Sequence, residues 1–462
     1  KRQVDIGASS GRHIIGTVEH GVMALHEVYR FENRLIEKNG HLCWDMEGLV
    51  QNVIEGLKAA HDAGYTPTTV GIDTWAVDFL LLDADGTPIG DPVAYRDGRT
   101  AAMREELEPI LPFTKLYART GIQYQSFNTV YQLCALKKEH PEQLAAAEHF
   151  LMVPDYLNYR LTGVMANEYT NASTTALVGA ISKDWDDEII NRLGLPRKIF
   201  GRISTPGTKL GNLSSAVKDY VGFDCTVVLP ATHDTGSAFL AVPARDDKAV
   251  YLSSGTWSLL GVENKDPITT PASMQANFTN EGGYEYRYRY LKNIMGLWMV
   301  QSVKKEIAED LSFGTICEMA SKCTIPSIVD ANDDRFLAPE NMTAEVQKAC
   351  EESGQQVPQG IAEIAAVIYN SLAVCYAKTL KELEEQTGCQ YRKIHVVGGG
   401  ANAGYLNRLT AEKTGRTVLA GPTEATAIGN LAVQMITGKE CSNLKDARNC
   451  IFHSFEIKQY EP

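Results

Sequence analysis

The hydrophobic pattern at the start of the chain predicts a strand, a tight turn and a second strand over residues 4–18, VDIGASSGRHIIGTV. From Trp44 the apolar residues step by three and one, which predicts an amphipathic helix that ends at Gly64. A buried strand TTVGID and a hairpin around the turn DADG follow, with helical segments around 130–147 and 185–193. The apolar stripe of the first helix is Met46, Leu49, Val50, Val53, Ile54 and Leu57.

The second half of the chain repeats this opening after the polar string VPARDDKA at 242–249. YLSSGTWSLLGVE at 251–263 again predicts strand, small-residue turn and strand. The remainder predicts an α/β end with helices over 360–386, 404–414 and from Ala425 to about Ile436, and with KIHVV, GGG and RTVLAG between them. We therefore expect two α/β domains, residues 1–244 and 245–462. Each opens with a Gly-, Ser- and Thr-rich turn whose backbone N–H groups are suited to binding phosphate.

Composition narrows the classes of partner. The 462 residues are 44% hydrophobic and carry a formal net charge of −13. Nucleic acids and anionic membranes attract basic surfaces, so we expect neither as a partner. We see no apolar run of about 18 residues and expect no transmembrane helix. The ten cysteines form no C-x-x-C pair, which favours buried thiols in a cytoplasmic protein over a zinc or redox site.

One carboxylate stands where a strand ends and a helix begins, in VVLPATHDTGSAF at 227–239. For Asp234 alone, a helix N-cap is the ordinary interpretation. Thr235 offers another possible cap, which leaves the role of Asp234 open at this point.

Ten strings in order along nearly the whole chain resemble the FGGY family of sugar kinases, and within it the rhamnulokinase group. The resemblance implies an α/β fold of two actin-like (ribonuclease H-like) domains with a nucleotide and sugar cleft between them. The first domain would carry the sugar site and the base, and the second would bind the nucleotide. The strings are DIGASSGR (5–12), GIDTWAVDFLLLD (71–83), PVAYRDGRT (92–100), PDYLNYRLTG (154–163), EYTNAST (168–174), HDTGSA (233–238), YLSSGTWSLLG (251–261), NEGGYEYRYRYLKNIMGLWMVQ (280–301), NDDRF (332–336) and VVGGGANAGYLN (396–407).

The resemblance assigns roles residue by residue. Asp234 is the implied base for phosphorylation of L-rhamnulose at O1 by ATP. In the turn at 8–12, Gly7 and Gly11 would permit a tight bend and Arg12 would reach phosphate as a fork. For Mg²⁺, Asp5 is the candidate ligand, with Asp73 and Asp234 as alternatives. The implied ATP contacts are Ala8, Ser9, Ser10, Gly11, Arg12, Thr256, Gln301 and Gly399, and the implied sugar contacts are Asp73, Trp75, Ala76, His233, Asp234, Thr235 and Asn293.

Two of the sugar contacts carry their own alternatives. Trp75 is equally well explained by core packing. Ala76 departs from the glycine usual in rhamnulokinases, and its methyl group bears on which ketose fits. Another deoxy-ketose such as L-fuculose is therefore the runner-up substrate.

Other classes of protein fit the sequence less well. The glycines of VVGGGANAG do not give the G-x-G-x-x-G of a dinucleotide-binding oxidoreductase, and no Walker A string occurs. A non-catalytic actin-like sugar-binding protein would share the fold but would need no base at Asp234. Sugar and ATP are the expected partners of a monomer or homodimer.

Overall fold

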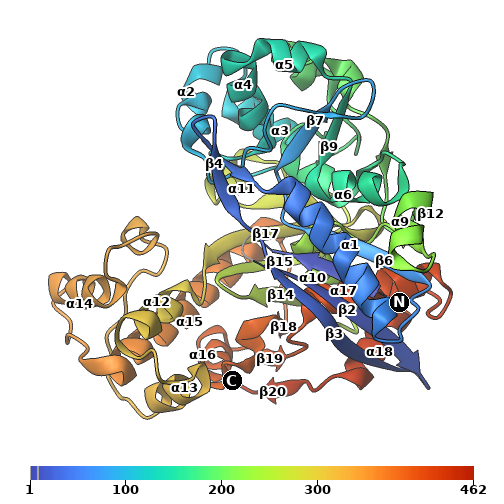
Figure 1. Cartoon of the computed structure of the whole chain (residues 1–462). Helices are drawn as coiled ribbons and strands as arrows, with labels where there is room; N and C mark the ends of the chain where they lie inside the picture. The colour runs from blue at the N-terminus through green and yellow to red at the C-terminus, as the bar shows by residue number, and fades with distance from the viewer. Residues whose placement is uncertain (1, 8–9) are drawn as a thin grey trace. The chain divides into compact units, whose positions relative to one another are not determined.

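The computed structural model describes residues 2–7 and 10–462 (Figure 1). Contacts divide the chain into two compact units, each assembled from separate segments. The first unit contains Lys1–Ala241, Glu263–Tyr290 and Thr426–Ser454, and the second contains Val242–Val262, Leu291–Ala425 and Phe455–Pro462. Two segments of the sequence-defined second half therefore group with the first unit. The assignment of sugar binding to 1–244 and nucleotide binding to 245–462 stays a prediction.

A six-stranded sheet is the centre of the first unit. β6 pairs in parallel with both β1 and β13, while β1–β2 and β2–β3 pair antiparallel. All six residues of β6 are buried, which is typical of a parallel strand covered on both faces. The strand order is β12 (Lys209–Asn212), β13 (Thr226–Val228), β6 (Thr69–Thr74), β1 (Arg2–Ile6), β2 (Ser10–Glu19) and β3 (Val22–Glu32).

The predicted first helix is confirmed as α1 (Met46–Asp62), which lies along this sheet in Figure 1. Asp45 caps it by accepting a hydrogen bond from the Gly48 N–H at 3.1 Å. Its apolar face packs with Val70, Ile72 and Val227 of the sheet into one buried cluster. The apolar face of the predicted helix and the apolar residues of the predicted strands thus form one core.

A mainly helical layer and three small sheets complete the first unit. The predicted hairpin around DADG is confirmed by the antiparallel pairing of β7 with β8. The short strands are β4 (Leu35–Lys38), β5 (His41–Trp44), β7 (Phe79–Leu82), β8 (Pro88–Ile89), β9 (His149–Met152), β10 (Asn167–Glu168), β11 (Ile203–Ser204) and β16 (Thr279–Gly282). The helices are α2 (Met103–Leu107), α3 (Phe113–Thr120), α4 (Thr129–Glu139), α5 (Pro141–Ala146), α6 (Val153–Thr162), α7 (Tyr169–Ala172), α8 (Asp187–Arg192), α9 (Ser215–Val221), α10 (Asp234–Leu240), α11 (Pro271–Gln275), α17 (Ala425–Thr437) and α18 (Leu444–Ser454).

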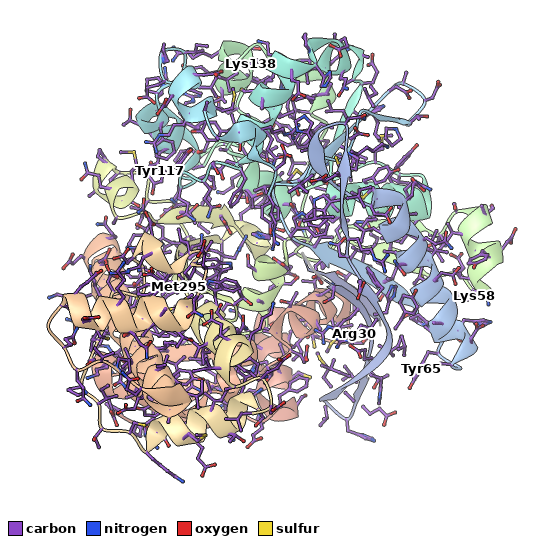
Figure 2. All side chains as sticks on the ribbon, turned by 60° about the vertical axis from the view of Figure 1, so that its left-hand side comes forward. Arg30, Lys58, Tyr65, Tyr117, Lys138 and Met295 are labelled. Carbon is purple, nitrogen blue, oxygen red and sulfur yellow. The ribbon has the colours of Figure 1, made fainter. Side chains whose placement is uncertain are left out.

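Side-chain contacts tie the two later segments into the first unit. The hydroxyl of Tyr117, labelled in Figure 2, donates to the Phe278 carbonyl at 2.8 Å and lies 2.7 Å from Ser273 Oγ. From α18, Ser454 Oγ accepts a hydrogen bond from the Met23 N–H of β3 at 2.8 Å. The first unit is therefore complete only when residues from all three segments are present.

Within the second unit the sheet order is β17, β15, β14, β18, β19, β20, and of β17 only Leu291–Met295 belong to this unit. β14 and β15 form the predicted hairpin of the second half, and β14, β18 and β19 are parallel. The strands are β14 (Ala249–Ser254), β15 (Trp257–Asn264), β17 (Tyr288–Met295), β18 (Lys393–Val397), β19 (Thr417–Ala420) and β20 (Lys458–Tyr460), and the helices are α12 (Trp298–Ile307), α13 (Phe313–Ser321), α14 (Met342–Glu352), α15 (Gly360–Thr387) and α16 (Gly404–Thr414).

Helix α15 corrects one expectation from the sequence. Its 28 residues are long and apolar enough to cross a membrane by length and composition, although the sequence predicted no such stretch. Within its most apolar window, 61% of the residues are buried inside the protein. Core helices that are covered all round have this composition, which explains the pattern.

Candidate active site

The carboxyl end of β6 and the segment before α10 lie side by side in the first unit. The Thr74 N–H donates to the Thr232 carbonyl at 2.8 Å, and Thr74 forms a parallel bridge with His233. This arrangement follows from the parallel pairing of β6 with β13, because parallel strands end at the same edge of a sheet. Ligands of α/β proteins bind at that edge.

Glu168 anchors the segment that leads to Asp234. Its fully buried carboxylate accepts hydrogen bonds from the Thr232 N–H at 2.6 Å and from the Thr232 hydroxyl at 2.8 Å. It also accepts from the N–H and hydroxyl of Thr170, and Thr170 Oγ1 accepts from the His233 N–H at 3.2 Å. Burial raises the pKa of Glu168, which these hydrogen bonds counteract. The backbone before Asp234 is therefore held in one position.

Asp234 is the first residue of α10, and His233 is the N-cap. The N-cap interpretation of Asp234 is therefore wrong, and Thr235 does not cap the helix either. The Thr235 N–H donates to Asp234 Oδ1 at 2.7 Å. The Asp234 side chain is 28% exposed, while that of His233 is 10% exposed. Solvent thus reaches this carboxylate at the edge where ligands bind.

His233 and Thr235 both contact a buried arginine, Arg289 of β17. Arg289 donates to Thr235 Oγ1 at 2.7 Å and lies 3.1 Å from His233 Nδ1. Glu281 pairs with the same guanidinium at 3.0 Å. Burial and the charge of Arg289 lower the pKa of His233 well below its ordinary value, so His233 is neutral.

The predicted sugar contacts Asp73 and Trp75, at the end of β6, are buried. Asp73 is fully buried, and its Oδ2 accepts a hydrogen bond from Asn430 Nδ2 at 2.7 Å. The Trp75 ring lies 4.4 Å from that of Trp44, and both indoles donate to Asp78 Oδ2. Trp75 therefore occupies the core position that the sequence left open. Sugar contacts by Asp73 and Trp75 stay predictions.

Ala76 sits in a strained turn. The next residue, Val77, has a φ of 68°, a conformation that β-branched residues rarely adopt. Thr129 holds the turn by donating to the Val77 carbonyl at 2.7 Å, and Asp78 accepts from Gln132 at 3.0 Å. Surrounding hydrogen bonds thus fix a backbone shape that the sequence alone would not favour.

The predicted phosphate turn is only partly described. Ala8 and Ser9 lie outside the described residues, and Ser10, Gly11 and Arg12 already belong to β2. A Cβ on Gly11 would lie 2.1 Å from the Phe31 ring, so this glycine serves packing and not the turn, contrary to the expectation. Arg12 Nη1 lies 3.9 Å from Glu27 Oε1 of β3. A phosphate contact by Ser10, Gly11 or Arg12 stays a prediction.

Two predicted nucleotide contacts come together in the second unit. The Thr256 hydroxyl donates to Gln301 Oε1 at 3.2 Å. Their elements are joined through backbone, because Leu297 and Trp298 N–H groups donate to the Gly255 and Thr256 carbonyls at 2.8 and 3.0 Å. The turn of the β14–β15 hairpin therefore rests on the start of α12.

The loop after β18 approaches the end of β14 closely. Gly398 has a φ of 86°, and a Cβ there would lie 2.8 Å from the Ser254 carbonyl oxygen. A Cβ on Gly400 would lie 1.8 Å from Ser254 Oγ, whereas one on Gly399 would meet nothing within 4 Å. The outer glycines thus permit close packing, and exposed Gly399 presents its backbone at the carboxyl edge of the sheet. Asn293, half-buried on β17, lies in the same unit.

Metal ligation by Asp5 stays a prediction. Asp5 lies on β1 in register with Asp73 on β6, but its side chain is outside the description. Among the described residues, no group of three or more His, Cys, Asp or Glu side chains is arranged to hold a metal ion. Mg²⁺ does not need such a group, because it keeps several waters and binds one or two carboxylates together with phosphates.

Both halves of the chain match one family. Residues 2–241 match the N-terminal domain of the FGGY family of carbohydrate kinases, and residues 250–438 match its C-terminal domain. This chain belongs to the FGGY family of carbohydrate kinases.

Named relatives and solved structures of FGGY kinases agree with that assignment. The rhamnulokinase of Oceanobacillus iheyensis is 49% identical over 99% of this chain and 97% of its own length. That of Bacillus subtilis is 42% identical, over 99% and 94%. Xylulose kinase from Lactobacillus acidophilus has a TM-score of 0.83 at 15% identity, over 100% of this chain and 94% of its own. Glycerol kinase from Plasmodium falciparum with ADP has a TM-score of 0.79 at 14% identity, over 99% and 93%.

These comparisons confirm the predicted two-domain, actin-like α/β fold of an FGGY sugar kinase. Sequence analysis missed Glu168, Glu281 and Arg289, although all three lie in strings that carry the resemblance. A charged residue within a strand-like run, such as Arg289 in YRYRYL, was the available signal. A buried charge requires a partner, but the sequence does not indicate which one.

Proposed function

We propose that this FGGY kinase transfers the γ-phosphoryl group of ATP to O1 of L-rhamnulose, giving L-rhamnulose 1-phosphate and ADP. The observation that carries the proposal is the similarity to proteins named rhamnulokinase, at 42–49% identity over 99% of the chain. Identity at this level over the full length supports a shared substrate more strongly than the fold, which xylulose and glycerol kinases also have.

Asp234 is the proposed base. A carboxylate is too weak to ionise an alcohol in advance, but the transition state of phosphoryl transfer is loose and the proton can move late. Asp234 then orients O1 and accepts its proton as the bond to phosphorus forms. Its place at the ligand-binding edge, with a partly exposed carboxylate on a backbone anchored by Glu168, supports this role.

His233, Thr235, Asp73, Trp75, Ala76 and Asn293 are the proposed sugar contacts. For ATP we propose the turn 8–12 together with Thr256, Gln301 and Gly399. Mg²⁺ would neutralise phosphate charge when bound, and Asp5 is its proposed ligand through water. The hydrogen bond between Thr256 and Gln301 and the open backbone at Gly399 support the nucleotide assignment.

A ketose panel with ATP in a coupled ADP-release assay tests the proposal. We expect the highest kcat/KM for L-rhamnulose, and a ³¹P signal coupled to the two C1 protons of the product. A higher kcat/KM for L-fuculose or L-xylulose would overturn the substrate and leave the kinase family intact. No sugar-dependent ADP release with any ketose would favour a non-catalytic sugar-binding protein.

The Asp234→Asn variant tests the base within the same assay. We expect kcat to fall about a thousandfold or more, because the proton acceptor and its orienting charge are both lost. Binding of an ATP analogue should persist. The matched control is Asp219→Asn on the exposed surface of α9, which should keep wild-type turnover. Turnover of Asp234→Asn near that of the control would remove Asp234 from this role.

We also propose a cytoplasmic location. All ten cysteines are free thiols in the structure, and seven of them are buried. Unpaired thiols in this number suit a reducing compartment.

A further inference from the structure

Arg289 makes four polar contacts, with the N-cap and first turn of α10 and with β16. Arg289 is 1% exposed, and its Nη1 donates to Thr235 Oγ1 at 2.7 Å and lies 3.0 Å from Glu281 Oε2. Nε donates to the Gly282 carbonyl at 3.1 Å, and Nη2 lies 3.1 Å from His233 Nδ1. Every residue in this network belongs to the first unit.

The contact between Arg289 and His233 determines where the imidazole carries its proton. A guanidinium has only donors and stays charged, so a hydrogen bond from Nη2 requires a bare Nδ1. A proton on Nδ1 would place two donors 3.1 Å apart. The Glu281 carboxylate would favour that proton, but its Oε2 is 3.6 Å from Nδ1, beyond hydrogen-bond range. The contact with Arg289 therefore determines the state of Nδ1, which carries no proton.

The neutral ring then has its proton on Nε2, which faces the proposed base. Nε2 lies 3.5 Å from Asp234 Oδ1 and 3.2 Å from Thr235 Oγ1, and the same hydroxyl oxygen lies 3.4 Å from Nδ1. Because Thr235 Oγ1 accepts from Arg289, its own hydrogen is left to point toward another acceptor. Arg289 thus sets the direction of two hydrogen-bond donors, on the residues that precede and follow Asp234 in the chain.

We propose that Arg289 is a positioning residue that fixes His233 as the neutral, Nε2-protonated tautomer and so presents this N–H, with the Thr235 hydroxyl, to the sugar oxygens beside Asp234. The kinetic part of this inference rests on the proposed function. The tautomer itself does not, because it is a property of the resting protein.

Burial of the ion pair explains why Arg289 can hold this geometry. Glu281 supplies the compensating charge, and its side chain is 15% exposed. A Cβ on Gly236 would lie 3.6 Å from the guanidinium carbon, and one on Gly283 would lie 3.5 Å from Arg289 Cγ. The backbone at both glycines therefore lies beside the Arg289 side chain, whose 2% exposure limits its freedom to turn away from His233.

Long-range ¹H–¹⁵N correlation spectra of the wild-type protein, labelled at histidine, test the tautomer directly. The His233 signals are identified by their loss in His233→Gln. We expect a bare, pyridine-type shift for Nδ1 and a protonated, pyrrole-type shift for Nε2 at pH 7. Protonation of Nδ1, or of both nitrogens, would overturn the inference whatever the enzyme's substrate is.

The role of Arg289 is tested by removing the ion pair together, in Glu281→Gln/Arg289→Met, so that no single charge is left buried. We expect a mixture of His233 tautomers and an increase of about tenfold or more in the sugar KM, with the ATP KM unchanged. Arg287→Met, whose side chain is 46% exposed in the same segment, is the matched control and should keep both properties. A double variant with an unchanged Nε2 tautomer and an unchanged sugar KM would refute the assignment.

The inference about His233 and the proposed kinase activity can be refuted independently. A wild-type spectrum with the expected tautomer in a protein that phosphorylates no ketose would refute the proposed function and leave the tautomer in place. Sugar-dependent turnover with a protonated Nδ1 would refute the role of Arg289 and leave the kinase in place.

Discussion

His41, at the start of β5, joins two carboxylates that lie far apart in the sequence. Nε2 lies 2.7 Å from Glu139 Oε1, and Nδ1 lies 3.0 Å from Asp97 Oδ2. The hydrogen bond with Glu139, followed by that with Asp97, raises the pKa of His41 although burial opposes the shift. The folded protein therefore binds this proton more tightly than the unfolded chain, whose histidine pKa is about 6.5.

The sign of this shift gives a pH-dependent prediction. Stability from His41 is fully present below about pH 6.5 and is lost as pH rises through the raised pKa. We expect His41→Gln to lower Tm more at pH 6 than at pH 9, measured by circular dichroism. The control His26→Gln, exposed on β3, should change Tm equally at both pH values. A larger loss for His41→Gln at pH 9 would contradict the prediction.

Individual residues differ in how well the sequence predicted them. Asp234 was located at the start of a helix because a strand run, a proline and small residues precede it. Gly11 was assigned to a turn, but its reason lies in the ring of Phe31, 20 positions away. Arg289 was missed because its partner His233 is 56 positions away, and hydrophobic periodicity carries no information about such pairs.

The start of α12 and the β14–β15 turn behave as one element. Gly296 lies between them, and a Cβ there would be 2.6 Å from the Gly255 carbonyl oxygen and 2.8 Å from that of Thr256. Backbone oxygens cannot swing aside as a flexible side chain can, so the turn itself must move. Thr256 would then lose its position relative to Gln301.

We therefore expect Gly296→Ala to raise the ATP KM about tenfold, a loss comparable to that of one or two hydrogen bonds, and to leave the sugar KM unchanged. Steady-state ADP release with each substrate varied in turn measures both. Gly314→Ala in α13 is the matched control, since its Cβ would meet only Ser312 Oγ at 3.9 Å. Equal ATP KM values for the two variants would show that this turn does not bind nucleotide.

Helices and strands were predicted correctly from the sequence where one face of the element is buried. The amphipathic pattern predicted α1, α15 and α16, and both glycine-rich hairpins were located. The apolar character of α15 was underestimated, because the prediction considered only the apolar residues on one face of the helix. Most of the helix is buried, so the other faces are apolar too. Short helices such as α7 were not predicted, since four residues hold too little of a helical period.

For the whole molecule, the three-segment composition of the first unit has a measurable consequence. Leu431 of α17 packs where a Cβ on Gly16 would lie, 2.6 Å from its Cδ1. Asn430 donates to Asp73, and Thr69 donates to Gln434 Oε1 at 2.7 Å. Residues 1–241 alone would expose these buried surfaces on the central sheet.

A fragment of residues 1–241 should therefore lack a cooperative thermal transition, although it spans the whole N-terminal family match. Near-ultraviolet circular dichroism during heating measures this. Co-expression with residues 242–462 is the control and should restore a complex with the transition of the intact chain. A fragment that unfolds cooperatively at the wild-type Tm would show that α17 and α18 are dispensable. The sequence did not predict that α17 and α18 pack in the first unit, because periodicity identifies a helix and not the sheet that it covers.

The scattered segments also set the timing of folding in a living cell. Both units take residues from beyond position 425, so neither is complete until those residues have been made. Ribosomes add about 5–20 residues per second, so β2 waits on the order of half a minute before α17 can cover it. During that interval the nascent chain carries a mixed sheet that α17 does not yet cover, and slow codons between the two elements or a shortage of chaperones would lower the yield of active enzyme.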